Sequence, residues 1–216
     1  MFVRESLVLL YMVVTVITLF TLGGTIYPNI VYSQPSTKLV HAGIGNASLV
    51  LTEFVPKDIE IKSGDSVMWD SPTTVPEPHS VTFLESNESY PAFAAPFLVP
   101  NSTEFMLPDP GANAEPLFAP SQPGEAMKTV ITVNSRAYLP VVIDSTGKNV
   151  TYLTPNSNYS MDGTESYINS GWLWPPGQAP PGPPLTNFTV TFDKPGSYAY
   201  ISNVHPWMTG TVTVKQ

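Results

Sequence analysis

Short runs of alternating residues, separated by turn residues, set the strongest limit on what this 216-residue chain folds into. Residues 59–62 (IEIK) and 188–192 (FTVTF) place apolar side chains at every second position. This period is typical of strands that bury one face, because successive side chains of a strand point to opposite faces. Turn signals at 63–65 (SGD) and 194–196 (KPG) bound these runs. The chain is therefore predicted to be an all-β, Greek-key sandwich or barrel.

The same pattern predicts further strands, and no stretch beyond the N-terminal segment shows a helical stripe. These strands are expected at 49–54, 66–69, 80–84, 129–133, 138–143, 198–201 and 211–214, with another candidate at 150–153. Residues 37–48 are interpreted as a polar approach to the first strand. His41 lies in that approach and is expected to face solvent rather than a binding site.

Residues 85–185, approximately, interrupt this pattern with a region rich in Pro, Gly, Ser and Asn. A structureless loop of such length is unusual in a compact domain, so this insertion is expected to be partly folded onto the sandwich. Residues 171–184 (GWLWPPGQAPPGPP) end it and are predicted to be stiff, because each proline fixes its φ angle. Trp172 and Trp174 are expected to cap a hydrophobic edge.

An uncharged segment precedes the predicted domain. Residues 7–26 are almost wholly apolar and, as an N-terminal helix, would be long enough to cross a bilayer. Arg4 precedes this run, and residues 31–33 (VYS) offer a signal-cleavage site before Gln34. Residues 1–33 are thus predicted to be a signal peptide or a membrane anchor, and residues 38–216 the folded domain. Both alternatives predict an extracytoplasmic domain, either secreted or attached to the membrane by the apolar segment.

Glycosylation sequons support export of the chain, although loops rich in Ser and Thr also generate such sequons by chance. The six sequons begin at Asn46, Asn87, Asn101, Asn149, Asn158 and Asn187. They favour a glycoprotein with an extracellular surface.

Charge and composition remove several classes of function. The net charge of −8, with nine Lys and Arg, argues against a nucleic-acid partner, which requires basic patches. The absence of cysteine excludes disulfides, zinc fingers and thiol catalysis. The sequence also contains no convincing carboxylate pair, Ser/His/Asp set or phosphate-binding glycine loop. The chain is therefore not predicted to be a turnover enzyme.

Two histidines and a methionine form a candidate metal site. His79 opens a predicted strand, whereas His205 and Met208 lie in the turn of YISNVHPWMTG (200–210). Imidazole and thioether groups are available to a soft or borderline metal at neutral pH, and their combination indicates copper. By themselves, two histidines near strand ends are more often ordinary surface residues than metal ligands.

Three segments resemble, in order, the signatures of the cupredoxin family, the plastocyanin-like type 1 blue copper proteins. They are FVPKDIEIKSGDSVMW (54–69), PHSVTF (78–83) and KPGSYAYISNVHPWMTGTVTV (194–214). The resemblance covers about residues 47–84 and 187–215, and the insertion is similar to those of archaeal members. It implies a Greek-key sandwich holding one copper ion, Cu(I) or Cu(II), and electron transfer between extracytoplasmic redox partners.

The resemblance also assigns roles to individual residues. His79 matches the first imidazole ligand, His205 the second and Met208 the weak axial thioether. The position of the ligand cysteine is occupied by Ser202, which is the one departure from the metal-ligand pattern. The implied metal set is therefore His79, Ser202, His205 and Met208.

Three further positions follow from the same resemblance. Ser80 matches a small polar residue that steadies the ligand loop. Pro206 and Trp207 match an apolar rim around an exposed edge of His205, where such proteins dock and exchange electrons.

The serine at position 202 changes the expected chemistry. A hydroxyl stays protonated near neutral pH and is a harder ligand than a thiolate. Weaker copper binding, a pale Cu(II) site and slower electron transfer are therefore expected. The serine is either native or an engineered substitution.

Three functions fit the sequence. The first is a one-electron carrier, and the second is a module that binds or buffers copper without redox turnover, which Ser202 favours. The third is a structural surface glycoprotein with a degenerate site, which the sequons and the insertion favour. A mononuclear copper enzyme has no substrate signature in the sequence.

Overall fold

The structure is a computed structural model that describes residues 34–85, 94–104, 123–179 and 184–216. The chain divides into two compact units, Met1–Gln34 and Pro35–Gln216, and every strand belongs to the second. The signal peptide or membrane anchor predicted at 1–33, with its apolar helix, lies outside the described residues. In the described part of the chain, no helix combines the length and the apolar character needed to span a membrane.

Five strands form the first sheet. Their order is β10 (Asn158–Met161), β12 (Asn187–Phe192), β4 (Ser66–Asp70), β1 (Thr37–Asn46) and β2 (Leu49–Val55). Along β12, half-buried and buried positions alternate as the sequence predicts. Strand β1 lies between β4 and β2, and it runs parallel to β4 and antiparallel to β2.

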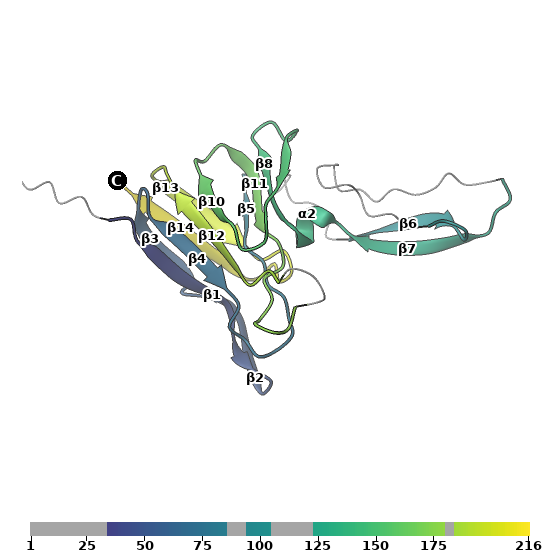
Figure 1. Cartoon of the computed structure of the whole chain (residues 1–216), viewed down its shortest axis with the longest axis horizontal. Helices are drawn as coiled ribbons and strands as arrows, with labels where there is room; N and C mark the ends of the chain where they lie inside the picture. The colour runs from purple at the N-terminus through teal and green to yellow at the C-terminus, as the bar shows by residue number, and fades with distance from the viewer. Residues whose placement is uncertain (1–33, 86–93, 105–122, 180–183) are drawn as a thin grey trace, which may run out of the picture. The chain divides into compact units, whose positions relative to one another are not determined.

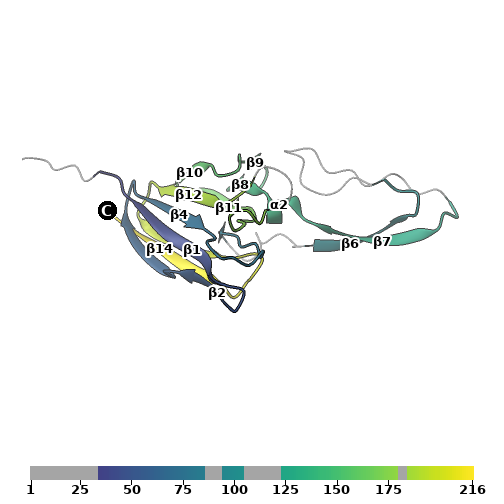
Figure 2. The same ribbon diagram turned by 60° about the horizontal axis from the view of Figure 1, so that its bottom comes forward.

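Seven strands form the second sheet. Their order is β3 (Asp58–Lys62), β14 (Thr209–Lys215), β13 (Gly196–Ile201), β5 (Thr82–Leu84), β11 (Glu165–Ser170), β8 (Pro140–Asp144) and β9 (Val150–Tyr152). The chain crosses from the first sheet to the second between β2 and β3, returns at β4 and crosses again to β5 (Figures 1 and 2). The prediction of an all-β, cupredoxin-like sandwich is confirmed.

Aromatic side chains join the two sheets. Phe83 of β5 contacts Trp69 of β4 and Phe192 of β12, with ring centroids 5.8 and 6.0 Å apart. Tyr200 of β13 contacts the same Trp69 at 5.3 Å. These steep ring contacts are the favourable arrangement for aromatic quadrupoles. They fix β5 and β13 against the first sheet, and both strands lead directly into the candidate metal site.

The segment before the first expected strand differs from the prediction. Residues 37–46 form strand β1, and His41 lies within it rather than ahead of the sheet. The polar interpretation was wrong because this segment pairs with both β2 and β4 and buries Val40 and Ala42, while the adjacent buried Gly43 breaks the alternation that would mark a strand. A register shift between Ala42 and Ile44 makes a bulge at Gly43.

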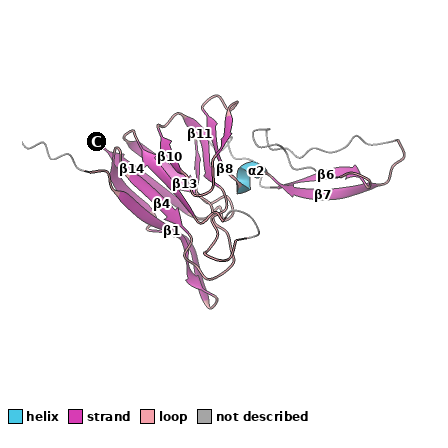
Figure 3. Ribbon diagram, viewed as in Figure 1, coloured by secondary structure: helices cyan, strands magenta, loops and turns pink. Residues whose placement is uncertain are grey.

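The insertion contributes to both sheets. Strands β8, β9 and β11 extend the second sheet and β10 edges the first, whereas β6 (Ala94–Pro100) and β7 (Met127–Val133) pair in a separate antiparallel sheet. Helix α2 (Ser135–Tyr138) is the short helix in Figure 3. The strand predicted at 138–143 starts later, at Pro140, because Tyr138 ends that helix.

Candidate metal centre

The pairing of β5 with β13 brings the two predicted ligand segments together. Thr82 lies opposite Ile201 and Phe83 opposite Tyr200 in an antiparallel ladder. The residues that precede β5 therefore lie beside the residues that follow β13. This arrangement joins His79 to the 202–208 loop, although the two segments are more than a hundred positions apart in the sequence.

Backbone hydrogen bonds close the 202–208 loop on itself. The Ser202 N–H donates to the Met208 carbonyl at 3.0 Å, and the Met208 N–H donates to the His205 carbonyl at 2.8 Å. His79, Ser202, His205 and Met208 are all buried. The structure therefore holds the four predicted residues in adjacent buried segments.

The two imidazole rings lie next to each other. Their centroids are 5.0 Å apart with 45° between the ring planes. Nδ1 and Nε2 of His79 and Nδ1 of His205 are buried, and none has a hydrogen-bond partner among the residues that the structure describes. A buried polar atom without a partner costs on the order of 1–3 kcal/mol, so a ligand that accepts one lone pair from each ring would offset part of this cost. A nitrogen–metal bond is about 2.0 Å long for zinc, so rings at this separation fit one shared ion.

Burial also sets the protonation state of His79. Removal of the ring from water, together with a smaller effect of the neighbouring His205, lowers the pKa of His79 to about 4, although the Glu77 carboxylate opposes the shift. His79 is therefore neutral at physiological pH. A metal requires that form, because a protonated imidazole nitrogen has no lone pair to donate.

Gly43 provides the space for the His79 ring. It adopts a left-handed backbone with φ of +77°, and a Cβ at this position would collide with Nε2 of His79. The β1 bulge thus places bare backbone against the ring. The backbone of His79 is itself fixed, because its N–H and carbonyl pair with Leu173 at 3.0 and 2.7 Å.

Ser202 holds the two ligand segments together through its hydroxyl oxygen. Oγ accepts the N–H of Ser80 at 3.4 Å and the N–H of His205 at 3.1 Å. A hydroxyl oxygen has two lone pairs, and these two contacts use both. Ser202 thus occupies the predicted cysteine position, but its oxygen is engaged in structural contacts.

Met208 is buried within the hydrophobic core and belongs to the same closed loop. The assignment of its sulfur as an axial ligand stays a prediction. Two imidazoles, one thioether and one hydroxyl make up the candidate set. Across the described ranges, no three His, Cys, Asp or Glu side chains are grouped as a metal site.

Glu77 was not singled out from the sequence, yet it contacts the second imidazole directly. Its Oε1 lies 2.7 Å from Nε2 of His205. The exposed histidine edge expected from the resemblance is accordingly absent, since His205 is 7% exposed. Trp207, at 66% exposure, packs edge-on against the His205 ring with centroids 5.1 Å apart.

A polar network supports the site from the side of the insertion. The Ser80 hydroxyl makes two hydrogen bonds of 2.7 Å with Asn203. It donates to the side-chain oxygen Oδ1 of Asn203 and accepts from the backbone N–H of Asn203. The Asn203 amide donates to the Ala137 carbonyl at 2.9 Å, and Asn169 accepts from Thr82 at 3.0 Å. The expected steadying role of Ser80 thus has a direct structural counterpart.

His41 lies away from this cluster. Its Nδ1 is 2.6 Å from Oδ1 of Asp70, and the two side chains are 35% and 30% exposed. A surface pairing of this kind supports the expectation that His41 is no part of the pocket.

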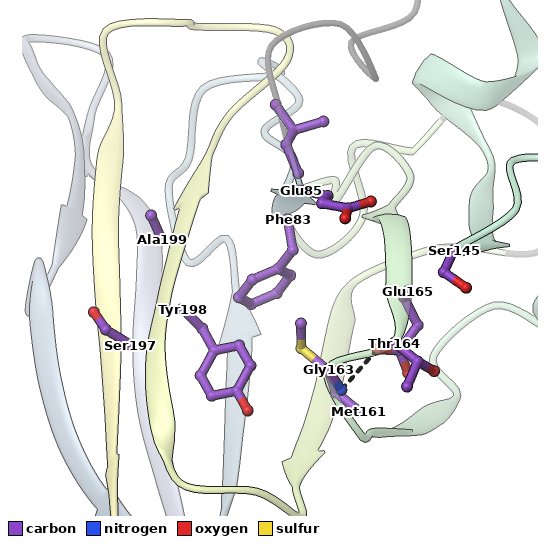
Figure 4. Close-up of a pocket in the computed structure, with 11 residues that line it drawn as sticks. Phe83, Glu85, Ser145, Met161, Gly163, Thr164, Glu165, Ser197, Tyr198 and Ala199 are labelled. Carbon is purple, nitrogen blue, oxygen red and sulfur yellow. Dashed lines mark hydrogen bonds between the residues drawn. The ribbon is translucent and has the colours of Figure 1, made fainter.

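The hollow shown in Figure 4 contains neither imidazole. It has a volume of about 220 Å³ and is lined by residues that include Glu85, Met161, Glu165 and Tyr198. The Glu165 carboxylate already accepts from the Gly163 N–H at 3.0 Å and the Tyr159 hydroxyl at 2.7 Å. Glu165, one of the two acidic residues that line this hollow, is thus engaged in local structure.

Comparison with known proteins gives a structural likeness and no sequence match. No protein-family model matches the chain, and no curated protein matches its sequence. Similar solved structures include cupredoxins and a copper-containing nitrite reductase from Thermus scotoductus. The purple cupredoxin of Nitrosopumilus maritimus is 17% identical over 82% of this chain and 99% of its own, with a TM-score of 0.31.

Two other likenesses are of the same order. A mutant plastocyanin of fern is 14% identical over 82% of this chain and 99% of its own, with a TM-score of 0.34. A methionine-to-alanine variant of amicyanin in its Cu(I) form is 12% identical over 83% and 82%, also with a TM-score of 0.34.

Proposed function

We propose that this chain is a copper-binding protein that carries single electrons, with His79, His205 and Met208 as the metal ligands. One observation carries the proposal: two adjacent buried imidazoles present three ring nitrogens without hydrogen-bond partners. Imidazole and thioether donors together favour copper, and a thioether favours Cu(I). Copper would supply a one-electron couple, while the protein supplies a dry, pre-formed set of donors.

Ser202 supports a second candidate, a module that binds or buffers copper without redox turnover. Both oxygen lone pairs of Ser202 accept backbone N–H groups, so this residue offers copper no thiolate and no free donor. Without a thiolate, the preferred geometries of Cu(I) and Cu(II) differ more, and electron transfer is expected to be slower.

The location and partners belong to the same proposal. An extracytoplasmic domain, secreted or anchored through residues 7–26, would exchange electrons with other redox proteins. The net charge of −8 favours partners with basic docking surfaces.

A copper titration of the metal-free protein tests the proposal. One equivalent of Cu(I) should bind, and His79→Gln and His205→Gln should each lower the affinity by more than about 100-fold, beyond typical effects of supporting residues. His41→Gln is the matched control and should bind copper normally. Equal binding by all three variants would contradict the proposed centre.

Voltammetry of the loaded protein separates the two candidates. A reversible one-electron wave supports the carrier. Bound copper without a reversible wave supports the buffering module and overturns the carrier.

A further inference from the structure

Glu77 occupies a position that is built by the local sequence. It lies between Pro76 and Pro78, whose rings fix their own φ angles. Its N–H donates to the Val75 carbonyl at 2.8 Å, and the side chain of Thr73 bonds to both backbone groups of Val75. The Glu77 backbone is therefore held in a defined turn two residues before His79.

The carboxylate of Glu77 selects which nitrogen of His205 carries a proton. An ionised carboxylate only accepts hydrogen bonds, so a neutral ring must place its proton on Nε2 to donate across the 2.7 Å contact. Nδ1 then keeps its lone pair. Nδ1 is the nitrogen of His205 that is buried without a hydrogen-bond partner in the described part of the chain.

We propose that Glu77 is a positioning residue, which fixes His205 as the Nε2–H tautomer and so leaves the Nδ1 lone pair for a metal. Its negative charge also covers the Nε2 edge of the ring. The metal-binding part of this inference rests on the proposed function. The tautomer is a property of the metal-free protein and is tested independently.

A second contact in the same chain provides an internal reference. At His41 the carboxylate of Asp70 faces Nδ1 instead of Nε2. The neutral His41 ring should therefore carry its proton on Nδ1. His41 and His205 are expected to be opposite tautomers in one sample.

The experiment is nitrogen-15 NMR of the metal-free full chain with labelled histidine, recorded at a pH at which the rings are neutral. The wild-type protein should show His205 as the Nε2–H form and His41 as the Nδ1–H form. Glu77→Gln should release His205 into a mixture, because an amide side chain both donates and accepts. The same variant should lower copper affinity about 10- to 100-fold, the usual effect of removing a ligand's hydrogen-bond partner.

Asp70→Asn is the matched control, since it neutralises the other histidine–carboxylate contact. It should change the His41 signals alone and leave copper affinity as in the wild type. A wild-type His205 that is mainly the Nδ1–H form would overturn the proposal, as would a Glu77→Gln protein with an unchanged tautomer and unchanged affinity. A released tautomer in a protein that binds no copper would support the orienting role of Glu77 and overturn the proposed function alone.

Discussion

His41 and His205 each contact one carboxylate, at 2.6 and 2.7 Å, yet they lie in contrasting surroundings. The His41 side chain is 35% exposed on β1, where water can reach the rest of the ring. The His205 side chain is 9% exposed, and its second nitrogen is buried without a partner beside His79.

This difference separates a surface pair from a candidate metal centre. An exposed nitrogen is satisfied by water, whereas a buried one must be paired or remain a cost to the folded state. The distance between the imidazole and its carboxylate therefore does not distinguish His41 from His205. The burial of the remaining nitrogen and the presence of a second imidazole decide which histidine is a candidate ligand.

The largest effect is expected when a thiolate is added to the buried site that contains His205. Ser202→Cys supplies a soft anionic donor that can accept N–H bonds and still bind copper. The loaded variant should become intensely coloured, and its copper affinity should rise by more than about tenfold. Visible absorption and a copper titration measure both. The exposed Ser145→Cys should stay colourless. A folded Ser202→Cys protein that stays colourless after loading with Cu(II) would contradict a copper centre in this loop.

The next largest effect, a loss of stability, is expected when a side chain is added at Gly43, beside the His79 ring. Gly43→Ala imposes a left-handed cost of about 1–2 kcal/mol and adds about 1–3 kcal/mol for the collision with a buried ring. Gly147→Ala is the matched control, since that glycine has φ of +70° and open space around it, so only the first cost applies. Urea unfolding compares the two. Equal losses of stability would mean that the ring is not tightly held.

Acid should destabilise the metal-free protein through His79. The pKa of this histidine is about 4 in the folded state, against 6.5 for an ordinary histidine. Between these values the unfolded chain binds more protons, so the free energy of unfolding falls as the pH falls, by on the order of 3 kcal/mol. Urea unfolding at a series of pH values measures this slope. His79→Gln should flatten it and His41→Gln should not; a slope unaffected by His79→Gln would refute the assignment.

The smallest effect on stability is expected at the surface contact between His41 and Asp70. Asp70→Asn removes the charge that faces His41, and half-exposed ion pairs contribute at most about 1 kcal/mol. Thermal unfolding should therefore shift only slightly. A large loss of stability would show that the His41 contact is more than a surface pair.

Much of the sandwich follows from local sequence. Strands β3, β4, β12 and β14 show burial that alternates with the side-chain pattern, because alternation is a property of a strand with one buried face. Strand β11 escaped prediction because five of its six residues are buried, so it carries no such alternation. Strand β1 escaped for a related reason, since its bulge breaks the period.

The residues of the candidate site likewise fall into those that the sequence indicates and those that only the structure reveals. The sequence indicated His79, His205 and Met208 by residue type and spacing. It gave no sign that Gly43 makes room for a ring, that Glu77 meets His205, or that Asn203 ties the loop to the insertion. These partners come from segments that share no sequence periodicity with the ligands.

The amino-acid sequence by itself determined the strand-forming segments and the chemical types of donor available to a metal. Only the tertiary structure decided that two imidazoles share a buried site, that His41 does not join them, and that the Ser202 oxygen accepts two backbone N–H groups. The physical reason is that side-chain alternation is set by neighbouring residues. The meeting of residues 79 and 205 depends instead on the register of β5 against β13, which is fixed by the packing of the whole sandwich.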